Sequence, residues 1–519
     1  MKQDEINKFK EDLREFYRVT EQFYKKEITV PQYKSVSGGY GSYAQRGGER
    51  SMLRLRLTGG EIDRESLEFI KDSIEKYQID LVHFTTCQTV QLHNLTKEQV
   101  CELVKEAYEH GIITRGGGGD FPRNVMCSPL SGVEEGEYFD VLPYAKAAEE
   151  YLLTIINKVK LPRKLKVCFS NGLKNETHAT FRDLGFVADE NLTFQVYAAG
   201  GLGIKPKMGV LVAEHIEPSK ILYCIKTMVD VFTEYGNYEN RAASRSRFLQ
   251  DTLSEEGLKR VFQDRLVKNL KHEHMDISVK EDKVVEKEGK DCAVEEKDFL
   301  VNPRVIKQKQ KGLYAVSYHP MGGKPKPSFF KKLYEVSSHM PEVTIRLTPD
   351  QGLYVIHLTK KEAEKILELT ADDTGTLFEK STACIGADIC QVGIGKSQLL
   401  LENCLERIRK EHFKNGVLPA IHISGCPSSC GTHQTASLGF RGGKKPTKNG
   451  PEFAFAVYEN GSEEKGKEQF GKELGVMLEK DIPEFLVELG REISEENSTF
   501  QEFQLKYPER TAQIAGKYI

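Results

Sequence analysis

The sequence lacks any long apolar run, and we expect no export signal at its N-terminus. Its 519 residues are 39% apolar and 29% charged, and no stretch approaches the length of a membrane span. The N-terminal segment MKQDEINKFKEDLREFYRVTEQFYKK alternates charged and apolar residues at helical spacing and has no uninterrupted apolar core. We therefore expect a cytoplasmic protein that does not bind a membrane.

An excess of charge and the common nucleotide-binding motifs are also missing. The net charge of -3 gives no reason to expect a nucleic-acid partner. GIGKS at 393–397 ends like a phosphate loop, but Cys390 stands where its first glycine is required. GGLGIKP at 200–206 lacks the third glycine of the dinucleotide fingerprint. We expect no nicotinamide or flavin site.

Disulfides are not expected either. Eleven cysteines are an odd number, and the chain carries no export signal, so metal ligation or buried thiols explain them better. A chain of this length forms two to four domains of ordinary size and has room for a large cofactor.

The first feature that is present is an internal repeat with a register of 263 residues. It carries Gly59 onto Gly322 and Gln88 onto Gln351. It also aligns NLTKEQV at 94–100 with HLTKKEA further along the chain, without a gap over more than forty positions. The chain therefore contains two copies of one module, which we call A and A′.

Each copy reads strand, helix, strand, helix. In copy A these are MLRLRL, ESLEFIKDSIEKY, VHFTTCQTVQLHNL and a helix that begins at Thr96 with Glu98 behind it. This pattern is typical of the halves of a ferredoxin-like split βαβ domain. We expect A and A′ to join in one mixed sheet.

A second repeat follows each module, and we call its copies B and B′. RDLGFVADENLTFQVYAAGG at 182–201 recurs as ASLGFRGGKKPTKNGPEFAFAVYENG, and KVCFSNG at 166–172 takes the place of HISGCPSSCG. The charged stretch at 280–299 indicates a solvated hairpin or loop near the junction of B and A′.

The predicted fold class is therefore α+β or α/β, internally duplicated, with a ferredoxin-like split βαβ domain, two flanking α/β domains and the cofactors where these parts meet. The predicted segments, in chain order, are an N-terminal helical arm 1–45, half-domain A 46–115, domain B 116–300, half-domain A′ 301–372 and domain B′ 373–519.

Four cysteines form two spaced pairs in B′. Cys384 and Cys390 stand in TACIGADICQVG, and Cys426 and Cys430 stand in HISGCPSSCGTHQ. Four thiolates are a sufficient ligand set for a 4Fe-4S cluster. Structural zinc favours a tighter C-x2-C spacing, although zinc or a redox thiol pair remains an alternative. The glycine, proline and serine residues of 425–431 would let backbone N–H groups turn toward cluster sulfurs.

The other cysteines differ. Cys101 and Cys404 lie on apolar helical faces, where buried thiols are expected. Cys127 and Cys168 loosely match the cluster segments of B′, but each stands alone, so we expect no cluster in B.

Copy B and the first strand of A offer basic residues instead. Arg54 and Arg56 alternate along that strand, Arg123 stands in GGGGDFPRNVMC, and Lys164 and Lys166 point the same way if LPRKLKV is a strand. Each alone is more often a solvated charge. Together they favour a pocket for a small oxyanion or a polycarboxylate.

These residues resemble a known family. GERSMLRLRLTGG, TTCQTVQLHNL, PRNVMC, LPRKLK, LGFVA, TACIGADIC and SGCPSSCG resemble, in order, the motifs of siroheme-containing sulfite and nitrite reductases. The resemblance extends from about residue 40 to the end of the sequence, and the paired cysteine motif is its most specific part.

The resemblance implies a role for each matching residue. Cys384, Cys390, Cys426 and Cys430 would ligate the cluster, and Cys430 would be shared with the siroheme iron. Gln91 and Arg163 would contact the siroheme. The residues that would grip the substrate are Arg54, Arg123, Lys164 and Lys166.

Two positions depart from the family pattern. Cys87 and His83 stand where the family usually, or often, has arginine, so two expected partners of siroheme carboxylates are replaced. Lys205 and Lys207 are candidate substitutes.

The predicted function is the six-electron reduction of sulfite to sulfide, with electrons from ferredoxin or a flavoprotein. Lys166 favours sulfite, because the nitrite reductases of this family tend to have asparagine at that position. The alternatives are nitrite reduction to ammonia on the same cofactors and a non-catalytic iron–sulfur scaffold or sensor. The four basic residues argue against a sensor, which needs no oxyanion grip.

Overall fold

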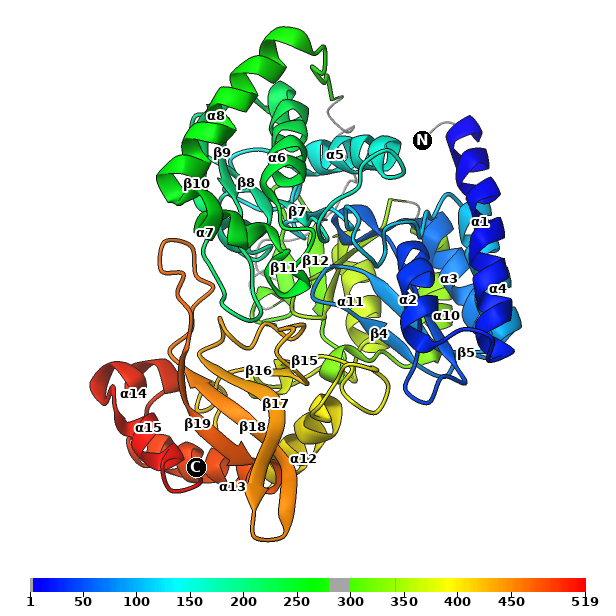
Figure 1. Ribbon diagram of the computed structural model, residues 1–519. Helices are drawn as coiled ribbons and strands as arrows, with labels where there is room; N and C mark the ends of the chain where they lie inside the picture. Colours follow the sequence, from blue (N-terminus) through cyan, green and yellow to red (C-terminus); the bar gives the residue numbers. More distant parts are fainter. Residues whose placement is uncertain (1–2, 280–298, 341) are drawn as a thin grey trace. The chain divides into compact units, whose positions relative to one another are not determined.

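The computed structural model describes residues 3–279, 299–340 and 342–519 (Figure 1). The chain divides into two compact units. Unit 1 comprises residues 1–201, 207–318 and 325–371, and unit 2 comprises residues 202–206, 319–324 and 372–519. Among the described helices, none is long and apolar enough to cross a membrane. The charged stretch predicted at 280–299 lies almost entirely outside the described residues.

Two helices precede module A in unit 1. Helix α1 (Gln3–Tyr24) packs against α4 (Lys97–Glu109). Helix α2 (Val30–Ser37) begins with a capping box, in which the side chain of Thr29 accepts from the backbone N–H of Gln32 and the side chain of Gln32 accepts from that of Thr29.

Module A forms a four-stranded antiparallel sheet with the order β1-β2-β5-β4. Its strands are β1 (Ser42–Ala44), β2 (Ser51–Leu55), β4 (Val82–Phe84) and β5 (Val90–Leu95). Apolar side chains of α3 (Arg64–Tyr77) and of α4 share one core with the sheet. The segment read as one second strand is a hairpin, since β4 and β5 pair antiparallel around a polar turn. Helix α4 is capped by Thr96 as expected, with Gln99 as the capping partner.

Module A′ repeats this plan in a five-stranded sheet with the order β11-β12-β14-β13-β3. Its own elements are β11 (Val305–Lys307), β12 (Tyr314–Tyr318), β13 (Thr344–Leu347), β14 (Leu353–Leu358), α10 (Pro327–Val336) and α11 (Lys360–Leu369). The fifth strand, β3 (Glu61–Ile62), comes from module A and pairs with β13. The expectation of one mixed sheet is confirmed only in part: β3 joins A to the sheet of A′, but the other described strands of the two modules form two antiparallel sheets.

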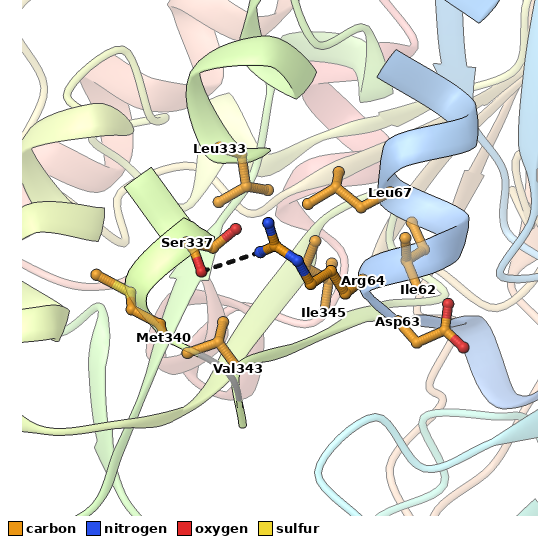
Figure 2. A pocket seen from close by; sticks show the side chains of 9 residues that line it. All are labelled: Ile62, Asp63, Arg64, Leu67, Leu333, Ser337, Met340, Val343 and Ile345. Carbon is orange, nitrogen blue, oxygen red and sulfur yellow. Dashed lines mark hydrogen bonds between the residues drawn. The ribbon is translucent and has the colours of Figure 1, made fainter. Parts of the chain in front are cut away.

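The seam between A and A′ also includes helix ends (Figure 2). Arg64, at the start of α3, donates to the carbonyl of Ser337 at 3.2 Å. The Arg64 guanidinium also lies over the ring of Tyr334, 4.6 Å from its centroid. Ile62 and Ile345, which face each other across β3 and β13, line the same small cavity. Its volume of about 10 Å³ has room for about one water molecule, so this cavity is no cofactor site.

Copy B completes unit 1 with a second five-stranded sheet. Strands β6, β7 and β8 are parallel, and β9 and β10 continue the sheet antiparallel. The strands are β6 (Met126–Cys127), β7 (Val167–Ser170), β8 (Leu184–Ala188), β9 (Phe194–Ala198) and β10 (Val210–Ile216). The helices are α5 (Leu142–Ile155), α6 (Ile221–Tyr235), α7 (Leu249–Leu253) and α8 (Glu255–His272).

Copy B′ forms the sheet of unit 2 with the same sequence of parallel and antiparallel pairs. The strands are β15 (Thr382–Ala383), β16 (Ile421–Ser424), β17 (Leu438–Thr447), β18 (Gly450–Glu459) and β19 (Lys472–Leu478). The helices are α12 (Ser397–Arg409), α13 (Ile482–Glu495), α14 (Phe500–Lys506) and α15 (Arg510–Ala515). The matching pair pattern supports the B and B′ repeat, and the duplicated fold class is confirmed.

Strand pairing fixes the register of this second repeat. Strands β16 and β17 begin 254 residues after β7 and β8, so that Cys168 is equivalent to His422. Cys127 pairs with Phe169 just as Ala383 pairs with Ile423, which makes Cys127 the equivalent of Ala383. The two cysteines thus lie in segments equivalent to those that flank the cluster loops of B′, which agrees with the loose match, but neither takes the place of a cluster cysteine.

Candidate functional site

The four cysteines of the paired motif lie on two adjoining loops of unit 2, one after β15 and one after β16. The backbone N–H of Cys384 donates to Ile423 at 3.0 Å, which fixes the first loop beside β16. Gly425 ties the loops together, because its carbonyl accepts from Ile394 and Gly395 at 2.8 Å and its N–H donates to the Cys384 sulfur at 3.1 Å. That last contact is the backbone-to-sulfur hydrogen bond that the glycine-rich sequence predicts.

The segment around Cys430 has an unusual backbone. Ser429 and Thr432 adopt left-handed conformations with φ of 54°, which are uncommon for residues other than glycine. Strain of this kind is concentrated at functional sites. Gly431 is held from the other side, since its N–H donates to the Ser424 hydroxyl at 3.0 Å. The Cys430 side chain is exposed, whereas the other three cysteines of the set are partly buried.

The four thiols have the donor chemistry that an iron–sulfur cluster needs. Burial and the neighbouring Cys430 raise the pKa of Cys384 to about 12, so a cluster that binds here must displace thiol protons. Across residues 3–279, 299–340 and 342–519, no three His, Cys, Asp or Glu side chains converge closely enough to hold one metal ion. A cubane of four irons and four sulfides spreads its ligands farther apart than one ion does. Four soft sulfur donors therefore suit that cluster.

Four further cysteines of the described residues are packed thiols. Cys127, Cys168 and Cys224 of copy B are fully buried, and burial raises the pKa of each. Cys404 is likewise buried, in the apolar core of unit 2. These thiols behave as small apolar side chains, as expected for Cys404.

In unit 1, two arginines converge on one glycine loop. Arg54 of β2 donates to the carbonyl of Gly117 at 2.6 Å, and Arg123 donates to the same carbonyl at 2.9 Å. Arg123 also donates to the carbonyl of Gly119 at 2.8 Å. Backbone carbonyls thus hold two guanidinium groups side by side without neutralising them.

Gln91 braces Arg54 from the neighbouring strand β5. With its amide oxygen toward Arg54, Gln91 accepts from that guanidinium at 2.6 Å and donates to His83 Nδ1 at 3.3 Å. His83 Nε2 lies 2.9 Å from Gln351 Nε2, so the chain of contacts extends into module A′. The predicted cofactor contact Gln91 is therefore a buried partner of the predicted substrate residue Arg54.

Lys166 lies directly before β7 and contacts Cys87. Its ammonium group is 3.2 Å from the Cys87 sulfur, and both side chains are largely buried. Burial alone would raise the pKa of Cys87, but Lys166 and then Arg182 outweigh it and lower the pKa to about 6. Burial lowers the pKa of Lys166, an effect that the Cys87 charge opposes. Lys166 therefore stabilises the thiolate form of Cys87.

Sequence reasoning missed the groups that surround this pair. Arg182 is 6% exposed and donates to the carbonyl of Thr177, and Arg245 donates to the fully buried carboxylate of Asp183. Asp183 also accepts from the backbone N–H of Lys166 at 2.9 Å. The sequence held one signal, since Arg182 and Asp183 directly precede the repeated LGF motif, but Arg245 comes from a distant loop.

The other predicted basic residues have varied positions. Arg163 forms an ion pair with Asp120, which also binds Arg241. Lys164 is partly buried, and its neighbour Leu165 is fully buried. The segment LPRKLKV is not the strand that was expected, because β7 begins only at Val167. Arg56 is structural: it pairs with Glu149 at 2.7 Å in the interior. Lys207 pairs with Asp251 at the surface and is therefore a poor substitute for a missing arginine.

Some donors of this basic cluster have no partner. Nε of Arg123 and Nε of Arg245 are buried and make no hydrogen bond within the described part of the chain. Burial and the charge of Arg54 lower the pKa of Arg123 to about 10, although Tyr43 and Cys87 oppose them. An arginine stays charged in a protein, so this lowering marks a buried charge that a bound anion would relieve. The residues therefore fit an anionic substrate or a polycarboxylate cofactor.

A set of four thiols and a buried cationic cluster on a duplicated α/β scaffold are the arrangement expected of an iron–sulfur oxidoreductase that acts on a small anion. Two family models match the chain. The nitrite/sulfite reductase ferredoxin-like half domain matches residues 43–110 and 306–372, which are again 263 residues apart at their starts. The nitrite and sulphite reductase 4Fe-4S domain matches residues 118–270.

Curated relatives carry both substrate names. The ferredoxin–nitrite reductase of Synechococcus elongatus is 25% identical over 418 residues, which are 76% of this chain and 77% of that protein. The ferredoxin–nitrite reductase of Zea mays is 25% identical over 76% of this chain and 69% of its own length. The sulfite reductase [ferredoxin] of Mycobacterium tuberculosis is 24% identical over 75% of this chain and 69% of its own.

A solved structure shares the fold. The Mycobacterium tuberculosis NirA protein matches with a TM-score of 0.79 at 21% identity, over 96% of this chain and 95% of that one. This chain belongs to the nitrite and sulfite reductase family, whose cofactors are siroheme and a 4Fe-4S cluster. The matched 4Fe-4S segment contains only three cysteines, Cys127, Cys168 and Cys224, so its ligands must be sought elsewhere.

Proposed function

We propose that this oxidoreductase catalyses the six-electron reduction of sulfite to sulfide. The observation that carries the proposal is the set of buried cations in unit 1: Arg54 and Arg123 bind one carbonyl, Lys166 lies beside Cys87, and Arg123 keeps an unused N–H donor. Neutral ligands would leave these charges uncompensated, whereas a small oxyanion would compensate them.

The cysteines of unit 2 would hold the cluster. Cys384, Cys390, Cys426 and Cys430 are its proposed ligands, with Cys430 also ligating the siroheme iron, and the exposure of Cys430 supports that second contact. Siroheme carries eight carboxylates, and Arg163 is a proposed partner of one of them. Gln91 would contribute to cofactor binding mainly by accepting a hydrogen bond that orients Arg54. When bound, the two cofactors supply electrons to the substrate.

The basic residues would bind and polarise the oxyanion. Arg54 and Arg123 are anchored by the carbonyl of Gly117, so they can hold a fixed orientation toward a substrate oxygen. Lys164 and Lys166 would add ammonium donors from the segment before β7. Groups placed in this way stabilise negative charge and donate protons as each oxygen leaves as water.

Sulfite is the preferred substrate because of its charge. It carries more negative charge near neutral pH than nitrite does, and a second ammonium group beside the first should favour it by about 1–3 kcal/mol, the contribution of one charged hydrogen bond. Lys166 supplies that group.

Nitrite is the second candidate, and one observation favours it. The Cys87 sulfur lies 3.2 Å from the Lys166 ammonium group and, as a thiolate, offsets its charge. A pocket in which the Cys87 thiolate neutralises the Lys166 charge has a weaker preference for sulfite, the more highly charged of the two anions.

Ferredoxin is the proposed electron donor, since the curated relatives named above are ferredoxin-dependent enzymes. A flavoprotein donor is the alternative.

Steady-state assays with reduced methyl viologen test the substrate. Wild type should reduce sulfite with a higher kcat/KM than nitrite. Lys166→Asn should lower kcat/KM for sulfite by roughly tenfold or more, and that for nitrite much less. Lys105→Asn, at an exposed lysine of α4, is the matched control and should change neither. Higher efficiency with nitrite in wild type would make the enzyme a nitrite reductase, and no turnover of either anion would favour the scaffold or sensor.

A further inference from the structure

A tyrosine lies beside the two anchored arginines. Tyr43, on β1, has its ring between two glycines: a Cβ atom at Gly118 would approach the Tyr43 oxygen to 2.3 Å, and one at Gly38 would approach it to 3.1 Å. The chain thus keeps side chains away from both positions and holds the phenol in a narrow slot. Its oxygen accepts from the backbone N–H of Gly119 at 2.8 Å.

The hydroxyl proton of Tyr43 has no acceptor among the described residues. The N–H of Gly119 donates to its oxygen, and the charged groups that act on it are the cations Arg123, Arg54 of β2 and Lys34 of α2. Arg123 links to the same loop, because it donates to the carbonyl of Gly119. A bound oxyanion at the arginines would provide the missing acceptor.

We propose that Tyr43 is a further catalytic residue, which donates a hydrogen bond and then a proton to an oxygen of the oxyanion held by Arg54 and Arg123. This inference rests on the proposed function of that cluster. It assigns a role to a residue that neither the sequence motifs nor the basic cluster includes.

The proton transfer is balanced as follows. The O–H bond of Tyr43 breaks, its electron pair stays on the phenolate oxygen, and a new O–H bond forms on the substrate. The electrons that cleave the sulfur–oxygen or nitrogen–oxygen bond come from the external donor. Each oxygen leaves as water after taking two protons, one from Tyr43 and one from solvent, and solvent then reprotonates the phenolate.

The surroundings favour this chemistry. Burial would raise the pKa of Tyr43, but Arg123 and Arg54 outweigh it and hold the pKa below its ordinary value of 10.0. An acid works best when its pKa approaches the working pH. The two guanidinium groups and the Gly119 N–H also stabilise the phenolate once the proton has left.

Tyr40 is a matched control on the same side of the module. Its ring contacts Arg115 at 4.7 Å, but its hydroxyl donates to the carbonyl of Asp12 at 2.8 Å, and burial raises its pKa. Tyr40 therefore also has an arginine neighbour, but its hydroxyl proton is already donated to a backbone carbonyl.

The test compares wild-type holoenzyme with Tyr43→Phe and Tyr40→Phe. With sulfite and reduced methyl viologen, kcat of wild type should fall as pH rises through the pKa of Tyr43, below pH 10. Tyr43→Phe should lower kcat by roughly 100-fold and lose this alkaline limb, while Tyr40→Phe keeps both. Calorimetric titration with sulfite should give about tenfold weaker binding to Tyr43→Phe.

Two outcomes separate this inference from the proposed function. If wild type reduces sulfite or nitrite and Tyr43→Phe matches Tyr40→Phe in kcat and pH profile, the inference is overturned. If wild type reduces neither anion, the proposed function fails, and equal sulfite binding by wild type and Tyr43→Phe would then overturn the inference as well. Incorporation of 3-fluorotyrosine at position 43 gives a second check, because the more acidic phenol should move the alkaline limb to lower pH.

Discussion

Gln88 of module A and Gln351 of module A′ make equivalent hydrogen bonds, each to a backbone carbonyl of the other module. Gln88 donates to the carbonyl of Leu347 at 2.8 Å, and Gln351 donates to the carbonyl of Phe84 at 3.1 Å. The 263-residue register relates the two glutamines, and it also relates the two acceptors. Both glutamines are fully buried with positive φ, 53° and 73°. The internal duplication thus acts as an approximate twofold relationship in space.

Replacing Gln88 by alanine should therefore destabilise unit 1. Besides Leu347, Gln88 bonds both backbone groups of Cys127, so the substitution leaves buried polar groups without partners at about 1–3 kcal/mol each. Calorimetry should give a melting temperature lower by about 2–4 °C for each kcal/mol. Gln501→Ala, at an exposed position of α14, is the control. An unchanged melting temperature for Gln88→Ala would mean that this contact is not a structural link.

The pair of Arg56 and Glu149 should behave as a coupled buried unit. The two side chains are 2% and 8% exposed, and Arg56 also donates to the carbonyl of Arg123. Arg56→Met or Glu149→Leu alone leaves a buried charge without its partner and should cost about 3–5 kcal/mol, whereas the double variant should cost less than the sum. Thermal unfolding of the three variants measures this. Strictly additive losses would contradict the coupling.

Cys87 predicts a pH dependence of stability. Its pKa in the folded protein is about 6, because Lys166 and Arg182 outweigh burial, against an ordinary 9.0. An acid whose pKa is lowered by folding stabilises the folded protein. This stabilisation is complete above the pKa of the unfolded chain and is lost as pH falls through the pKa of the folded protein. The melting temperature of wild type minus that of Cys87→Ser should therefore rise between pH 6 and pH 9. A difference that stays flat across this window would show that Cys87 is not a thiolate.

Much of the fold was predictable because it depends on local pattern. Thr96 precedes an amphipathic helix and caps it, and Gly59 and Gly322 occupy equivalent left-handed positions with φ of 62° and 59°. The spacing of the paired cysteines indicated a cluster, with zinc or a redox thiol pair as alternatives, and the structure places the two loops that carry them side by side.

Features that depend on distant contacts were not predictable. Cys87 and Lys166 are 79 residues apart, and nothing in either local sequence indicates a thiolate–ammonium pair. Tyr43 stands on a three-residue strand with no motif, and its environment comes from arginines on other elements. The hairpin of β4 and β5 was read as one strand, because the polar turn between them has no glycine or proline to mark it.

The most direct test of the account is the iron and siroheme content of Cys430→Ser beside that of Cys404→Ser. Wild type should contain about five iron atoms per chain, four in the cluster and one in siroheme, with the absorption bands of both cofactors. Because Cys430 is proposed to ligate both irons, Cys430→Ser should lose the cluster and lose or strongly shift the siroheme bands. Cys404 lies in the apolar core, so Cys404→Ser should keep both. An unchanged iron content and spectrum in Cys430→Ser would contradict the site assignment.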